Sequence, residues 1–343
     1  MASMSEVSVE EEIEQLRMKR PHVVLLGAGA SLAACPKGDK FGRRLPTMAN
    51  LVETLRLAGL IPPSLHGMNF EEAYTSLSAD PSAAASAGEI ERRIYDYFSD
   101  LVLPDEATIY DYLVLSLQPK DVIATFNWDP FLIQAIRRHR LFFDSIEVPT
   151  ILCLHGNVME GYCIEDMVFG VNRAACSKCG RLFTASRLLY PVSQKNYSDH
   201  PLINLSWKKL AAAFESAFMV TVFGYGAPSS DRDAVKLLND AWGEVERRDL
   251  EQFEFIDIRK EEELVVTWKP FIHSHHFNVE TDYFDSSLAL HPRRTGEDFI
   301  NRLVEGKCTT PNRPPRGVSL VELRDWHAAL ANVEKRYIAE RHG

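Results

Sequence analysis

Four short motifs with the residue types for ligand binding and proton transfer each follow an apolar run in this sequence. They are Gly27-Ala28-Gly29-Ala30-Ser31, Thr125-Phe126-Asn127-Trp128-Asp129, His155-Gly156-Asn157, and Gly224-Tyr225-Gly226 with Asp231 shortly after it. A glycine turn after a buried strand lets backbone amides approach a pyrophosphate. An asparagine offers both a donor and an acceptor, and a histidine can move a proton near neutral pH. Together these types favour a nucleotide site with acid–base chemistry.

Each motif also has a purely structural interpretation. The glycines can form a tight turn, Asn127 an Asx turn, and Asp129 a helix N-cap before Pro130. A lone histidine is often a bonded structural group. A dehydrogenase fingerprint is disfavoured, because Leu32 occupies the third glycine position and Glu53 falls inside a predicted helix.

The elements that must position these motifs alternate between strand and helix. Apolar, β-branched runs predict strands over the ranges 22–26, 121–125, 148–154, 218–223 and 253–258. Helical spacing predicts helices over 9–19, 47–59, 88–102, 106–117, 230–246, from 130 onward and from 319 onward. This alternation predicts an α/β fold with a doubly wound parallel sheet, a helical insertion, and a ligand site at the carboxyl ends of the strands.

Two segments interrupt the alternation. Residues 80–88 are low in complexity and are expected to be an exposed connection. Residues 158–201 contain cysteines and show little periodicity, and they are too long for an ordinary loop. We expect the second segment to form a small inserted module.

The order of the four motifs, with the cysteine-bearing segment between the third and fourth, resembles the sirtuin family over residues 21–260. The resemblance implies a Rossmann-like domain that binds NAD. Outside it, the sequence predicts a charged helix within 1–20, from the capping-box spacing of Ser8 and Glu11, and a C-terminal extension over 261–343 that ends in a helix. The resemblance implies that the glycine loop holds the pyrophosphate and that Asn127 and Asp129 address the nicotinamide and ribose. His155 would act as a base on a ribose hydroxyl. It assigns further NAD contacts to a set that comprises Gly27, Ala28, Gly29, Ala30, Ser31, Thr125, Asn127, Gly224, Tyr225, Gly226 and Asp231.

Departures from the sirtuin pattern narrow the expected activity. Residues 35–43 replace the Pro-Asp-Phe-Arg element of protein deacylases, Phe126 stands where glutamine is expected, and residues 224–231 replace the Gly-Thr-Ser element. The sequence is therefore more similar to the divergent sirtuin-like domains of bacterial anti-phage systems. That resemblance implies an NAD glycohydrolase that releases nicotinamide and ADP-ribose. Two alternatives are an NAD-dependent protein deacylase and a non-catalytic subunit that binds NAD or ADP-ribose.

The same resemblance carries expectations about partners. A freely active NADase would poison its host, so we expect gating by homo-oligomerisation or by a partner such as a nucleic-acid translocase or nuclease.

The six cysteines are too few for a disulfide scaffold and are expected to be thiols or metal ligands. Sirtuins hold a structural zinc with two Cys-x-x-Cys pairs, and this chain offers Cys176, Cys179 and a lone Cys163. Glu160 and His200 are candidates for the fourth ligand, the alternative being a lost site with ordinary thiols. Cys153 is expected in the core, whereas Cys35 and Cys308 have no partner nearby in sequence.

Two histidine-rich segments receive structural interpretations. His273, His275 and His276 could share a strand face for a metal, but an aromatic-rich strand or loop explains them adequately. His291-Pro-Arg293-Arg294 could bind a phosphate, but such a run is more often a solvated surface.

Composition restricts the remaining classes. The formal charge of −10 and a pI near 5.6 argue against direct nucleic-acid binding. No stretch approaches the roughly 18 to 20 apolar residues of a membrane helix, and the N-terminus lacks the pattern of a signal peptide. We expect a cytoplasmic protein.

Overall fold

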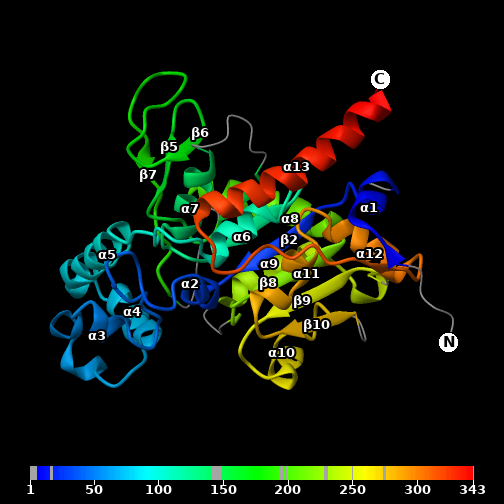
Figure 1. The fold of residues 1–343 in the computed structure, drawn as a ribbon. Helices are drawn as coiled ribbons and strands as arrows, with labels where there is room; N and C mark the ends of the chain where they lie inside the picture. The colour runs from blue at the N-terminus through cyan, green and yellow to red at the C-terminus, as the bar shows by residue number, and fades with distance from the viewer. Residues whose placement is uncertain are drawn as a thin grey trace.

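The computed structural model describes residues 6–15, 18–140, 148–192, 197, 199–227, 231–248, 250–272 and 276–342. Within these ranges six parallel strands form one sheet in the order β10-β9-β8-β2-β3-β4 (Figure 1). Their bounds are β2 (His22–Leu26), β3 (Val122–Thr125), β4 (Thr150–Cys153), β8 (Met219–Phe223), β9 (Gln252–Ile256) and β10 (Phe277–Glu280). Numbered along the chain, the order is 3-2-1-4-5-6, that of a doubly wound nucleotide-binding sheet. The predicted fold class is confirmed.

The central strand β2 separates two hydrophobic cores, because successive side chains of a strand point to opposite faces. Val24 and Leu26 enter one core, and Val23 and Leu25 enter the other. The first core packs against α2 and α4 to α7, and the second against α8, α9 and α10. Both faces of β2 are therefore buried, which explains its unbroken apolar run.

The α-helices are α1 (Val9–Gln15), α2 (Ala28–Ala34), α3 (Leu51–Thr54), α4 (Phe70–Ala79), α5 (Ala84–Ser99), α6 (Ile109–Leu115), α7 (Phe131–Arg140), α8 (Pro201–Ser216), α9 (Arg232–Trp242), α10 (Glu261–Trp268), α11 (Ser287–Leu290), α12 (Thr295–Leu303) and α13 (Leu320–His342). Short 3-10 turns lie at Ala58–Leu60, Pro63–Leu65, Pro81–Ala83, Val245–Arg247 and Tyr283–Asp285. Among the described helices, none is both long and apolar enough to cross a bilayer.

Two insertions project from the sheet (Figure 1). The predicted helical insertion comprises α3, α4 and α5 between β2 and β3. The cysteine module is a three-stranded antiparallel sheet of β5 (Glu160–Cys163), β6 (Val168–Val171) and β7 (Thr184–Ala185). The long α8 follows it, an element that the sequence analysis did not predict.

The segments outside residues 21–260 join the same fold. The sixth strand, β10, lies beyond residue 260 and extends the sheet, so a boundary at 260 divides one sheet. At the other end, β1 (Glu6–Val7) pairs with β11 (Cys308–Thr309), and Glu12 of α1 is fully buried.

Two local predictions were wrong. The helix expected over 47–59 is reduced to α3, because Arg56 adopts a left-handed backbone conformation with φ of 54°. The segment 80–88, expected to be an exposed connection, contains the start of α5 at Ala84. Its alanines are the strongest helix formers, and the side chain of Asp80 caps the preceding turn.

Candidate active site

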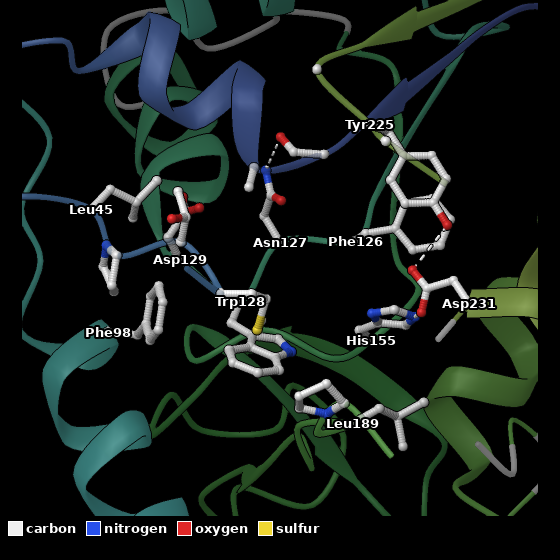
Figure 2. A pocket seen from close by; sticks show the side chains of 18 of the residues that line it. Leu45, Phe98, Phe126, Asn127, Trp128, Asp129, His155, Leu189, Tyr225 and Asp231 are labelled. Atoms are coloured by element: carbon white, nitrogen blue, oxygen red, sulfur yellow. Dashed lines mark hydrogen bonds and ion pairs between the residues drawn. The ribbon is translucent and has the colours of Figure 1, made fainter. Parts of the chain in front are cut away.

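A cavity of about 260 Å³ opens at the carboxyl ends of β2, β3, β4 and β8, where the four motifs meet (Figure 2). It lies at the point where the strand order reverses, between β2 and β8. Its motif residues are Gly27, Ala28, Phe126, Asn127, Trp128, Asp129, His155, Gly224, Tyr225, Gly226 and Asp231. The structure therefore brings the four predicted motifs to one site.

The loop after β2 packs closely against the loop after β8, and this contact requires glycines. The Gly27 amide donates to the Phe223 carbonyl and the Gly29 amide to the Gly224 carbonyl, each at 3.0 Å. A Cβ on Gly27 would lie 2.5 Å from the Gly224 oxygen, which is closer than real Cβ contacts come. Packing alone thus accounts for these glycines. Gly27 and Ala28 line the cavity, and Ser31 is buried behind it.

Asn127 joins the loop after β3 to the loop after β2. Its side-chain amide donates to the Gly27 carbonyl at 2.8 Å and to Ser31 Oγ at 3.0 Å. Thr125 lies behind Asn127, and its hydroxyl accepts the Asn127 backbone amide. Asn127 is the residue of this motif that both fixes the loop and faces the cavity.

Asp129 is a buried carboxylate at the cavity wall. It accepts hydrogen bonds from the Ser31 hydroxyl at 2.7 Å and from the Phe131 amide at 3.2 Å. Burial raises its pKa to about 6, although these bonds oppose the shift. Tyr110, which the sequence analysis missed, adds its hydroxyl 2.6 Å from Ser31 Oγ. The carboxyl therefore titrates near neutral pH inside a network of hydroxyl groups.

The His155 imidazole is buried between aromatic rings. Its ring stacks on Tyr197 and meets the edge of Phe126 at 5.0 Å between centroids. Nε2 lies 3.3 Å from the Tyr197 hydroxyl and 3.9 Å from Asp231 Oδ1. No sequence signal distinguished Tyr197, which comes from the end of the cysteine module.

The loop after β8 supplies an aromatic wall. Tyr225 stacks on Phe126 with centroids 3.9 Å apart and an interplanar angle of 6°, and its hydroxyl donates to Asp231 Oδ2 at 3.0 Å. Residues 228–230 of this motif lie outside the described residues.

The helical insertion completes the wall opposite the sheet. Its contribution comprises Leu45, Pro46, Thr47, Met48, Glu71 and Phe98. The sequence analysis missed these positions, because they belong to an insertion and carry no motif.

The cysteine module gathers Cys163, Asp166, Cys176 and Cys179 so that one ligand atom of each lies within 4.8 Å of the others. Cys163 Sγ lies 3.6 Å from Cys179 Sγ, near the separation of about 3.8 Å that tetrahedral zinc–sulfur bonds of about 2.3 Å require. Asp166 Oδ2 lies 3.2 Å from Cys176 Sγ. Three thiols and a carboxylate are a donor set that suits zinc.

The two fourth ligands expected for this site were wrong. Glu160 is buried beside Cys153 and Ser186, and burial raises its pKa to about 7. His200 instead meets the edge of the Tyr162 ring. Asp166 takes the position, and the spacing Cys163-x-x-Asp166 could have indicated it.

The remaining candidates that the structure describes do not line this cavity. Cys153 is buried as expected, and so is Cys35. The solvated surface expected at His291, Arg293 and Arg294 was wrong, because all three are buried and the arginines pair with Glu334 and Glu12. His273 and His275 lie outside the described residues.

Comparisons with known proteins give a distant structural likeness. No family model matches the sequence, and no curated protein matches it. Solved structures do match. One is a Sir2 homolog–NAD complex, which is similar at 13% identity and a TM-score of 0.40 over 94% of each chain. Another is Sir2 bound to acetylated peptide, at 15% identity and a TM-score of 0.37, covering 84% of this chain and 93% of that one. A structure concerned with sirtuin substrate affinity matches at 15% identity and a TM-score of 0.39, covering 84% and 94%.

Proposed function

We propose that this chain is a sirtuin-like NAD glycohydrolase that cleaves the bond between nicotinamide and ribose. The observation that carries the proposal is that Asn127, Asp129 and His155 line one cavity at the switch point of a doubly wound sheet. Crevices at such points are where this class of sheet binds nucleotides. The glycine loop at Gly27 and Ala28 reaches the same cavity.

Asp129, Asn127 and His155 would have different roles in this reaction. Loss of nicotinamide leaves positive charge developing at the ribose, and a preorganised polar site stabilises such charge. Asp129 supplies a carboxylate whose described hydrogen bonds come from a hydroxyl and an amide, and burial raises its pKa to about 6. Asn127, held by two bonds of its own, fixes the geometry. His155 accepts the proton of a ribose hydroxyl or of the attacking water.

One departure from the sirtuin pattern changes the wall of the cavity. Phe126 replaces the glutamine expected from the sirtuin pattern and stacks on Tyr225, so the wall beside His155 is aromatic. The proposal extends to a gated effector of anti-phage defence, active in a homo-oligomer or with a partner protein, because unregulated NAD loss would harm the host cell.

The test is nicotinamide and ADP-ribose release from NAD by the purified full chain, at low and high protein concentration. We expect release without any peptide, and a loss of about 100-fold or more in His155→Ala and Asn127→Ala. His66→Ala is the matched control, since His66 lies outside this cavity and should keep full activity. Undiminished turnover in both site variants, or release only with an acyl-lysine peptide, would contradict the proposal.

We also propose that Cys163, Asp166, Cys176 and Cys179 hold a structural zinc that fastens the module. Metal analysis by mass spectrometry should find about one zinc per chain in the wild type and none in Cys176→Ser. Cys308→Ser, which changes an exposed cysteine elsewhere, is the control and should keep the metal. Equal zinc in Cys176→Ser and the wild type would refute this assignment.

A further inference from the structure

Phe126, Tyr225 and Asp231, which lie at positions where the chain departs from the sirtuin pattern, form one connected unit around His155. Phe126 stacks on Tyr225, the Tyr225 hydroxyl holds Asp231, and Asp231 faces His155 (Figure 2). Phe126 also contacts the His155 ring in an edge-to-face arrangement. Residues separated by about a hundred positions in sequence thus surround a single imidazole.

Asp231 has an unusual orientation for its position. It is the N-cap residue of α9, where an aspartate ordinarily accepts the first amides of the helix. Here its side chain makes no such bond and turns to the Tyr225 hydroxyl instead. The Asp231 and His155 side chains are only 6% and 8% exposed. A charge–charge interaction between them is therefore weakly screened by solvent.

We propose that Asp231 is the positioning residue of His155, holding the imidazole and stabilising the imidazolium that forms when His155 accepts a proton. The proposal rests on the proposed role of His155 as the base. A carboxylate beside Nε2 favours the tautomer with its proton on Nε2, which leaves the Nδ1 lone pair to accept one. In that step an O–H bond of the ribose hydroxyl or water breaks and an N–H bond forms. The new positive charge is balanced by Asp231.

Other titratable groups near the imidazole do not compete for this role. Among the described residues, the groups given by the contacts of this region are the phenols of Tyr197 and Tyr225 and the carboxyls of Asp129 and Asp233. Burial raises the pKa of both phenols, so they stay neutral. Asp129 lines the cavity with bonds to Ser31 and Phe131, and Asp233 is exposed on α9. Asp231 Oδ1 lies 3.9 Å from His155 Nε2.

The test is the titration of His155 by NMR of the unliganded protein labelled in its histidine rings, assigned with His155→Gln. Asp231→Asn should lower the pKa of His155 by about one to two units, a tenfold to hundredfold loss of proton affinity. Tyr225→Phe, which keeps the stack but releases Asp231, should shift it less in the same direction. Asp233→Asn removes the same charge from an exposed site and should leave the titration in place.

Equal titration of His155 in the wild type and Asp231→Asn would overturn the proposal, whatever the enzymatic activity. Where NAD is turned over, the acidic limb of the kcat/KM profile of Asp231→Asn should move to lower pH with the NMR value. A raised KM with an unmoved acidic limb would instead make Asp231 a substrate-binding residue. The NMR result thus stays decisive if the glycohydrolase assignment fails.

Discussion

Two buried aspartates on neighbouring elements, Asp111 of α6 and Asp129 after β3, differ in what surrounds their carboxylates. Asp111 accepts hydrogen bonds from Arg138 and from His139 Nε2. Burial alone would raise its pKa, but these bonds outweigh it and lower the pKa to about 2. Asp129 instead accepts hydrogen bonds from the Ser31 hydroxyl and the Phe131 amide, and burial raises its pKa to about 6.

The difference separates a structural carboxylate from one suited to chemistry. Asp111 is satisfied inside the protein, so it stabilises the junction of α6 and α7. Asp129 keeps an unfavourable burial energy, and it lines the cavity where a cationic group could enter. Strongly shifted groups in a cleft are typical of functional sites.

The largest stability effect should follow from Asp111→Asn. The change removes the buried carboxylate that the half-buried Arg138 and the buried His139 share, which costs about 3 to 5 kcal/mol of unfolding free energy. Urea denaturation at pH 7 measures it. Asp105→Asn, which breaks an exposed pair with Lys40, is the control and should cost less than about 1 kcal/mol. A loss below 1 kcal/mol in Asp111→Asn would remove the contrast.

Asp129→Asn should raise the free energy of unfolding, and the gain should be larger at high pH than at low pH. The folded-state pKa of about 6 exceeds the model-compound value of 3.8, so the wild type loses stability as pH rises from about 4 through 6. Two pKa units correspond to about 3 kcal/mol. Relative to the wild type, the variant should therefore gain about 3 kcal/mol more at pH 8 than at pH 4. If the variant and the wild type differed by the same unfolding free energy at pH 4 and pH 8, the pKa of Asp129 would not be raised.

The smallest expected effect on stability comes from the helix cap beside Asp111. Thr108 forms a capping box with Asp111 at the start of α6. Thr108→Ala should cost about 1 kcal/mol, because one cap is lost while Arg138 and His139 still hold Asp111. Thermal unfolding with Thr281→Ala as an exposed control would measure this. A cost equal to that of Asp111→Asn would mean that the cap, and not the ion pair, secures the carboxylate.

The location of the site could be predicted from the sequence, but several residues that complete its contacts could not. Strands β2, β3 and β8 could be predicted because both faces of each are buried, so an unbroken apolar run ends at the motif. Asn127 and His155 could be predicted because polar residues at such strand ends converge. Tyr110 and Tyr197 could not, because their roles depend on contacts between elements distant in sequence.

The central claim is that Asp129 contributes to activity at the expense of stability. The most direct measurement is NAD turnover by Asp129→Asn at pH 8, made on the same preparation whose unfolding free energy is determined. We predict a variant more stable than the wild type whose nicotinamide release falls by about 100-fold or more. Wild-type turnover in the stabilised variant would contradict the claim and leave Asp129 a structural residue like Asp111.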